Sequence, residues 1–442
     1  SGYHWSDGIG PEEDRPARLN LAWKSLESNR FGFDEFVDWA KKAGAETMAA
    51  VNLGTGTPED AGYLVEYCNH PSGTKWSDLR RKNGHDQPHN IKIWCLGNEM
   101  GGYWQIGRLS AEDYGKKAME TAKMMRLIDP SIELLACGSS TTRLSSYPEW
   151  DRVVLEYLYD QIDYISIHHY YGYDNELGDY LGSFVDMDRF IRTIIATTDY
   201  VKALKRTPKI LGLSFDEWNV WYHQPISFPT WEWDTAPKRL EQIYTLLDAL
   251  VVGGLICTLL RHADRVKIAC VAQLVNVIAP ILTGPGGRVI KQSIFHPLQQ
   301  VSIYGRGQVL NPLMTCPRYA SKMYGDVPIL QLAAVFNQDA GMVSLFILNC
   351  DQWEDTELSL DFRSFGPAEL LEHILLNGPD LGAANSFSDP ERVKPRALPV
   401  SPMNTDQISV VLPKLSWNML RFSLLTSDAG KGSPNEVRAM HY

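Results

Sequence analysis

The stretch that decides the fold is Ile91-Lys92-Ile93-Trp94-Cys95-Leu96-Gly97-Asn98-Glu99-Met100, where an apolar run ends at a glycine and an acid follows. A short apolar run bounded by a turn residue predicts a buried strand of a parallel sheet. A second stretch repeats this arrangement, Ile210-Leu211-Gly212-Leu213-Ser214-Phe215-Asp216-Glu217-Trp218-Asn219. Both strands are therefore expected to carry a glutamate at the carboxyl end, where (β/α) barrels place their chemistry.

Around these two strands, residues 34–310 alternate between helix-like and strand-like segments, which predicts a parallel α/β fold. Besides 91–96 and 210–215, strands are expected at residues 47–53, 132–137, 164–168 and 268–274. Thr57 before Pro58 and two acids predicts a helix start, and so does Ser110 before two further acids. Another helix is expected at residues 239–250. Six such strands favour a barrel over a sandwich.

The pattern changes after about residue 310. Short strands at residues 343–348, 357–360 and 408–412 lie between Gly, Pro, Asn and Asp turns, which is typical of an antiparallel β-sandwich. We therefore expect the α/β class, with a (β/α)8 TIM-type barrel followed by a C-terminal antiparallel β-sandwich. The expected divisions are a catalytic barrel at 1–310, a sandwich domain at 311–426 and a polar tail at 427–442.

Composition narrows the possible partners. The 442-residue chain has a formal net charge of −11, with acids spread along it, whereas a nucleic-acid partner calls for a basic stripe. The sequence has no run of about 18 apolar residues, so no membrane span is expected. Seven cysteines are scattered without a Cys-x-x-Cys pair, which favours reduced thiols in the cytoplasm and no metal or other cofactor.

Glu99 and Glu217 form the candidate catalytic pair. Glycoside hydrolysis needs one carboxyl that protonates the leaving oxygen and one carboxylate that attacks, or activates water at, the anomeric carbon. Asn98 can bind a sugar hydroxyl, and Trp218 and Trp221 offer aromatic faces of the kind that sugar C–H groups pack against. Strand-end glutamates are also common helix caps and salt-bridge partners, so a structural role is the alternative for each.

Several long motifs closely resemble those of glycoside hydrolase family 51, whose best-known members are α-L-arabinofuranosidases. They are WCLGNEM at 94–100, WQIG at 104–107, DYIS at 163–166 with His168 and 170–172, LSFDEWNVWY at 213–222, and AQLVNVIAP at 272–280. Residues 1–25 also fit, so the resemblance covers nearly the whole chain. Residues 101–103 depart from the family, which usually has an acid, Gly and Pro there. Because that loop borders the leaving-group side of the site, the sequence leaves open which polymer the enzyme prefers.

The resemblance implies roles for particular residues. Glu99 would be the acid/base and Glu217 the nucleophile of a retaining exo-enzyme. Its substrates would be terminal non-reducing α-L-arabinofuranosyl residues of arabinan, arabinoxylan or arabino-oligosaccharides. Six residues would bind substrate or arrange the site: Asn98 and Gln273 at sugar hydroxyls, His168 and Tyr170 at the carboxylates, and Trp23 and Trp221 as pocket walls. Core packing is the alternative for the two tryptophans, and a structural strand-end histidine is the alternative for His168. His169 should be structural, because it faces the other way along the strand. Family members also tend to form hexamers.

The strand count differs from that of the related enzyme clan, in which the acid/base ends barrel strand four and the nucleophile strand seven. Here the two glutamates end the second and fifth expected strands, so the spacing of three agrees while the count is short by two. At roughly 30 residues per βα unit, we expect about 60 N-terminal residues, and the first two barrel strands, to be absent. Such a barrel would expose two unpaired edges.

A retaining mechanism sets a geometric expectation. It needs the carboxyl groups about 5–5.5 Å apart, whereas inversion needs up to about 9.5 Å. The charge of Glu217 is expected to raise the pKa of Glu99. Two rival functions stay open: the same chemistry on another glycan, as a β-xylosidase or endoglucanase, and a non-catalytic carbohydrate-binding or assembly protein.

Overall fold

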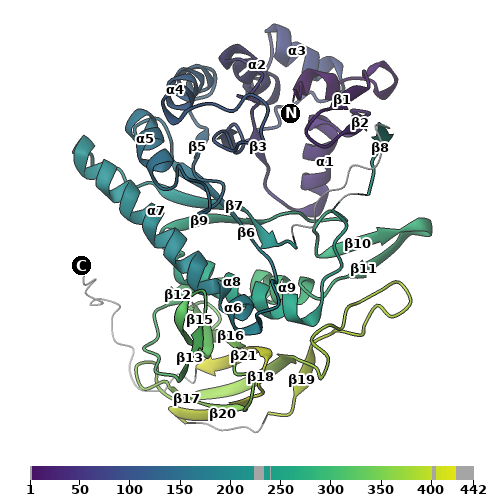
Figure 1. Ribbon diagram of the computed structural model, residues 1–442. Helices are drawn as coiled ribbons and strands as arrows, with labels where there is room; N and C mark the ends of the chain where they lie inside the picture. The colour runs from purple at the N-terminus through teal and green to yellow at the C-terminus, as the bar shows by residue number, and fades with distance from the viewer. Residues whose placement is uncertain (1, 223–232, 239, 401–404, 425–442) are drawn as a thin grey trace.

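The computed structural model describes residues 2–222, 233–238, 240–400 and 405–424. Figure 1 shows an α/β part that contains the N-terminus and, below it, a β-rich part formed by the C-terminal third of the chain. The α/β part is built on a six-stranded parallel sheet, in the order β3-β4-β5-β6-β7-β9. Its strands are β3 (Met48–Ala50), β4 (Ile93–Leu96), β5 (Glu133–Cys137), β6 (Tyr164–Tyr171), β7 (Gly212–Val220) and β9 (Val266–Val271). All six expected strands are therefore confirmed, and in this part of the chain β3 and β9 are the edges of the sheet.

Helices alternate with these strands along the chain and pack around the sheet (Figure 1). They are α1 (Phe33–Ala43), α2 (Pro58–Asn69), α3 (Lys75–Lys82), α4 (Ala111–Ile128), α5 (Glu149–Leu158), α6 (Leu177–Leu181), α7 (Ser183–Lys205), α8 (Leu246–Arg261) and α9 (Phe295–Tyr304). The predicted starts of α2 and α4 are confirmed, because Thr57 and Ser110 each accept a hydrogen bond from a backbone N–H three residues on. This order of strands and helices is the predicted barrel-type architecture.

The helix expected at residues 239–250 was placed wrongly. The helix in that region, α8, begins at Leu246, with Thr245 as its N-cap in a capping box with Asp248. Just before it, the backbone N–H of Tyr244 donates to the Gln292 side chain at 2.9 Å, so this residue is held by a distant loop rather than by a helix. Arg239, the predicted start, lies outside the described residues.

Smaller elements surround the main sheet. In the described part of the chain, 3-10 turns occur at η1 (Trp5–Gly8), η2 (Glu12–Asp14) and η3 (Pro285–Gly287). A small sheet joins β1 (Arg18–Asn20), β2 (Ser25–Glu27) and β8 (Asp234–Thr235), and a hairpin joins β10 (Ile281–Gly284) to β11 (Arg288–Lys291). Within the described residues, each helix falls short of the length and apolarity that a bilayer crossing requires. All seven cysteines are free thiols, as expected.

The C-terminal part is antiparallel. One sheet has the order β12 (Gln308–Leu310), β15 (Leu330–Asn337), β16 (Met342–Asn349), β21 (Ser416–Leu424), β18 (Ala368–Leu376) and β19 (Arg396–Leu398). Two pairs lie beside it: β13 (Arg318–Ser321) with β14 (Gly325–Pro328), and β17 (Thr356–Asp361) with β20 (Gln407–Leu412). One apolar core lies between the large sheet and the β17–β20 pair, while the other face of that sheet packs on α8. The expected strands at 343–348, 357–360 and 408–412 and the C-terminal antiparallel sheets are thus confirmed.

Where one domain ends and the next begins stays a proposal. We keep the division into residues 1–310 and 311–426. Strand β12, which precedes residue 311, already pairs with β15 of the C-terminal sheet. The proposed tail at 427–442 lies outside the described residues.

Candidate active site

Glu99 is placed by a tight turn directly after β4. Gly97 and Glu99 both have positive φ angles, 95° and 50°, and this turn directs the glutamate away from the line of the strand. A non-glycine residue in the left-handed region is uncommon and is often found at functional sites. The Glu99 carboxylate accepts hydrogen bonds at Oε2 from Trp104 Nε1, at 2.5 Å, and from Gln105 Nε2, at 3.2 Å.

Glu217 does not follow its strand, as the sequence suggested, but lies inside β7. The pairing of β7 with both neighbouring strands shifts register here: Ser166 pairs with Ser214, whereas His168 pairs with Glu217. One extra residue in β7 is a β-bulge, which re-aims side chains that would otherwise alternate. Asp216 and Glu217 consequently both approach His168, at 3.6 Å and 3.2 Å.

The two glutamates meet at one ring nitrogen. His168 Nδ1 lies 3.0 Å from Glu99 Oε1 and 3.2 Å from Glu217 Oε2. An oxygen of each glutamate and a ring nitrogen of His168 all lie within 4.8 Å of one another. This separation suits the retaining arrangement and is well short of the roughly 6.5–9.5 Å that inversion needs. Side-chain exposure is 11% for Glu99 and 28% for Glu217, so both carboxylates reach solvent.

The electrostatics differ from the expectation for Glu99. Burial would raise its pKa, but hydrogen bonds from His168, Trp104 and Gln105 outweigh burial and lower it. The pKa of Glu217 is raised by burial, with the charge of Glu99 adding to the effect and His168 opposing it. The predicted raised pKa of Glu99 is therefore wrong for the free site, because three donors stabilise the carboxylate. Glu99 and Glu217 lie close enough for the protonation of one to depend on that of the other.

Two other predicted residues join the pair. Tyr170, on β6, donates from its hydroxyl to Glu217 Oε1 at 2.5 Å. The Trp221 ring, just beyond β7, packs edge-on against Tyr170 with ring centroids 5.2 Å apart. His169 is buried and faces the opposite side of the strand, beside Thr141 and the Phe190 ring of α7. This is the structural position expected for it.

Three predicted sugar contacts are not linked to the pair. Asn98 and Gln273 are exposed, and Trp23 lies in the turn between β1 and β2 with 41% of its surface exposed. Within the described ranges, no hydrogen bond or ion pair connects any of the three to either glutamate. Their proposed roles at the sugar stay predictions.

The sequence interpretation missed four residues that contact the site. Trp104 and Gln105 bind Glu99, and Ser166 and Asp216 lie behind His168. Trp104 and Gln105 belong to a motif already noted, and their spacing of five and six residues from Glu99 is a turn-sized separation that could have indicated contact. Asp216 gave no such signal, because its approach depends on the bulge.

Two groups of side chains within the described residues have the spacing of metal ligands. One is the catalytic group itself, Glu99, His168 and Glu217. The other is Asp34, His85 and His89, which shares no residue with it. In this second group, His89 Nε2 lies 2.8 Å from Asp34, which also accepts a hydrogen bond from a tyrosine hydroxyl. Direct hydrogen bonds thus account for both groups, and we assign no metal to either.

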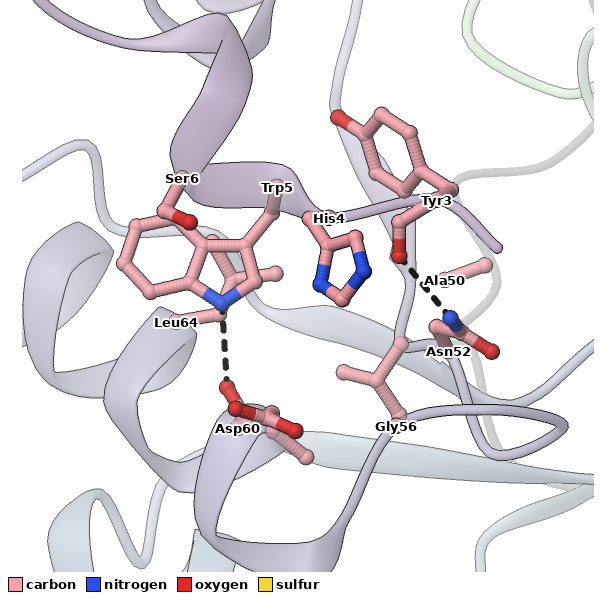
Figure 2. Close-up of a pocket in the computed structure, with 11 residues that line it drawn as sticks. Tyr3, His4, Trp5, Ser6, Ala50, Asn52, Gly56, Asp60 and Leu64 are labelled. Carbon is pink, nitrogen blue, oxygen red and sulfur yellow. Dashed lines mark hydrogen bonds between the residues drawn. The ribbon is translucent and has the colours of Figure 1, made fainter. Parts of the chain in front are cut away.

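A separate hollow lies beside β3 and the N-terminal segment (Figure 2). There the Trp5 indole donates to the Asp60 backbone carbonyl at 3.2 Å, and the Asn52 side chain donates to the Tyr3 carbonyl at 2.8 Å. Neither catalytic glutamate lines this hollow. It is therefore distinct from the glutamate pair.

Comparison with known proteins agrees with this geometry. Residues 1–189 match the family model of the α-L-arabinofuranosidase 1 domain, and residues 216–416 match that of the α-L-arabinofuranosidase C-terminal domain. The chain is 52% identical over 423 residues to an intracellular exo-α-(1→5)-L-arabinofuranosidase of Halalkalibacterium halodurans, covering 95% of this chain and 84% of the relative. It belongs to glycoside hydrolase family 51.

Solved family 51 structures have the same fold. The α-L-arabinofuranosidase of Bifidobacterium longum superposes with a TM-score of 0.91 at 39% identity, over 96% of this chain and 85% of that one. The enzyme of Thermotoga maritima, in complex with arabinose, gives a TM-score of 0.85 at 30% identity, over 95% and 84%. A second Bifidobacterium longum relative, 42% identical over 94% of this chain and 82% of its own, is named an exo-α-(1→6)-L-arabinofuranosidase. This family 51 member is accordingly a glycoside hydrolase.

Proposed function

We propose that this chain is a retaining exo-α-L-arabinofuranosidase, with Glu217 as nucleophile and Glu99 as acid/base. The observation that carries the proposal is the contact of both carboxylates with the single Nδ1 of His168, at 3.0 Å and 3.2 Å. Two carboxylates this close suit attack by one and proton donation by the other. The names of the family 51 relatives support arabinofuranosides as substrates. They lend no support to a β-xylosidase, an endoglucanase or a non-catalytic binding protein.

The first half-reaction forms a glycosyl-enzyme ester. A Glu217 oxygen attacks the anomeric carbon while the bond to the leaving oxygen breaks, and that oxygen takes the proton of Glu99. For Glu99 to hold this proton, its carboxylate must lose some of the donors that now stabilise it. The leaving oxygen would take the place of Trp104 and Gln105 at Oε2, which removes two of the three donors and raises the pKa of Glu99.

The second half-reaction releases the sugar. Glu99, now ionised, takes a proton from water as the water oxygen attacks the anomeric carbon and the ester bond to Glu217 breaks. Two displacements on the same carbon restore the original configuration. Tyr170, which donates to Glu217 Oε1, would hold the nucleophile in line throughout.

Azide rescue of two variants tests the assigned roles. In Glu217→Ala, azide should enter from the face that the carboxylate occupied and give the inverted glycosyl azide. In Glu99→Ala, azide should attack the covalent intermediate and give the retained azide. Glu357→Ala, an exposed strand glutamate of the C-terminal part, is the matched control and should keep full activity. Exchange of the two azide configurations would reverse the roles, and the absence of rescue in Glu217→Ala would remove it as nucleophile.

The finer specificity is also part of the proposal. We propose terminal non-reducing residues of arabinan, arabinoxylan or arabino-oligosaccharides as substrates, with the linkage left to a panel of α-(1→3), α-(1→5) and α-(1→6) arabino-oligosaccharides. The relative from Bacillus subtilis is named intracellular, which supports a cytoplasmic location. A hexamer is supported by the family resemblance, and light scattering on the purified chain tests it.

A further inference from the structure

The far nitrogen of His168 is held by a second pair of side chains. His168 Nε2 lies 3.2 Å from Ser166 Oγ and 3.6 Å from Asp216 Oδ1. The Ser166 hydroxyl donates to Asp216 Oδ1 at 2.7 Å. A hydroxyl has one proton and can accept through its lone pairs. Because the Ser166 proton is committed to the carboxylate, its oxygen is left to accept, and His168 Nε2 must be the donor.

The proton on Nε2 determines which role Nδ1 of His168 can take. With a proton on Nε2, the remaining mobile proton of the site is shared among His168 Nδ1, Glu99 and Glu217. Burial would lower the pKa of the imidazole, but the three surrounding carboxylates outweigh it and raise this pKa well above its ordinary value. His168 and Ser166 are buried, and the Asp216 side chain is 8% exposed, so bulk water hardly competes with the chain of hydrogen bonds.

Among the described residues, three thiols on neighbouring strands also face this network of hydrogen bonds. Cys95 of β4 donates to Asp216 Oδ2 at 3.8 Å, and Cys137 of β5 and Cys270 of β9 lie within electrostatic range of the same carboxylate. Burial raises the pKa of each thiol, to about 11 for Cys137 and Cys270. They are neutral at working pH. The charges that decide the state of the imidazole are therefore those of the three carboxylates.

We propose that Ser166 and Asp216 are positioning residues, a relay that fixes the proton on His168 Nε2 and thereby turns Nδ1 toward both catalytic glutamates. The relay touches neither sugar nor the reacting atoms, and it rests on the proposed function because it acts only through the glutamates. The β7 bulge makes it possible, since it brings Asp216 to the imidazole beside Glu217. The same bulge thus places both the nucleophile Glu217 and the carboxylate of Asp216 that holds His168.

The test compares three positions on two paired strands. Asp216→Asn removes the charge and keeps the shape, and Ser166→Ala breaks the relay at the hydroxyl. Ser214→Ala is the matched control: Ser214 is the register partner of Ser166, is also buried, and its hydroxyl has no partner within the described part of the chain. NMR titration of the imidazole signals of labelled histidine in the full chain, with His168 assigned through His168→Gln, reports the pKa directly.

Asp216→Asn should lower the pKa of His168 by about 1 to 2 pH units, as expected for loss of a nearby opposite charge, and Ser166→Ala by less. Because Glu99 shares its proton with His168, the basic limb of kcat/KM should also move to lower pH, by more in Asp216→Asn than in Ser166→Ala. KM at pH 6 should change less than about threefold, because neither residue touches the sugar. Ser214→Ala should match the unmodified chain in both measurements.

An unchanged His168 titration in Asp216→Asn or, should that variant not fold, in Ser166→Ala would overturn the relay. A shifted titration with an unchanged pH–rate profile would equally overturn its positioning role. Failure of the proposed function is distinguishable. It would appear as an unmodified chain that releases no arabinose, or as Glu217→Ala without azide rescue, whatever the imidazole titration shows.

Discussion

Replacing Trp104 by phenylalanine should extend activity to higher pH. Its indole N–H donates to Glu99 Oε2 at 2.5 Å, and this bond is one of the three that lower the pKa of the glutamate. Phenylalanine keeps an aromatic ring and removes the donor. Loss of a donor that stabilises the carboxylate raises the pKa of Glu99. Because the acid/base must be protonated to start the reaction, the basic limb of kcat/KM moves upward.

The size of the shift follows from the strength of the bond. A hydrogen bond to a charged group contributes about 1.5–3 kcal/mol to stability. The Trp104 side chain is 40% exposed, so water can replace the lost donor, and the net effect falls to about 1 kcal/mol. At about 1.36 kcal/mol per pH unit, the basic limb should move up by about 0.5–1 unit. In the substrate complex the leaving group would already have displaced the indole from Glu99. The shift is therefore expected in kcat/KM, whose pH dependence reports the pKa values of the free enzyme.

The assay is the pH dependence of kcat/KM with a nitrophenyl α-L-arabinofuranoside. Trp39→Phe is the control, since Trp39 lies in α1 with a similar exposure of 43%. It should leave the profile unchanged. A basic limb that stays in place in Trp104→Phe, or moves downward, would refute the assignment of Glu99 as an acid stabilised by this loop.

Three further predictions concern the nucleophile, the packing and the pH dependence of stability. Tyr170→Phe removes a donor from the nucleophile carboxylate, so kcat should fall about 10–100-fold and the acidic limb of the profile should move to higher pH. Gly253→Ala places a Cβ 2.4 Å from the Trp417 ring and should cost about 1–3 kcal/mol in urea unfolding. Gly62→Ala should be nearly neutral, because its Cβ would meet only flexible side-chain atoms of Met124, at 2.8 Å, and Ile128, at 3.1 Å. Burial raises the pKa of Asp151 from 3.8 to about 6, so its stabilising contribution is present below about pH 4 and is lost as pH rises through 6. Asp151→Asn should remove that dependence. The free energy of unfolding of Asp151→Asn minus that of the unmodified chain, measured by urea unfolding, should therefore rise by up to about 3 kcal/mol between pH 4 and pH 7.5.

Local sequence rules predicted the parallel sheet well. The helix starts at Thr57 and Ser110 depend on residues three positions apart, so the cap and its partner are both visible in the sequence. The six parallel strands were found because each is a short apolar run closed by a turn. The Glu99 turn follows the same logic, since Gly97 marks the end of β4.

Features that depend on distant contacts could not be predicted. The bulge in β7 exists only in register with β6 and β9, so neither the interior position of Glu217 nor the approach of Asp216 to His168 was foreseen. The late start of α8 reflects a hydrogen bond to Gln292, 48 residues away. The direction of the Glu99 pKa shift depends first on the hydrogen bond to His168, 69 residues away, which local spacing does not reveal.

Whether configuration is retained tests the central claim most directly. The purified chain would hydrolyse a nitrophenyl α-L-arabinofuranoside in the presence of methanol, and proton NMR would identify the first-formed methyl arabinofuranoside. Two carboxylates that contact one histidine nitrogen predict the α-anomer, through an ester on Glu217. Formation of the β-anomer would mean a single displacement, and the account of Glu99 and Glu217 given above would be contradicted.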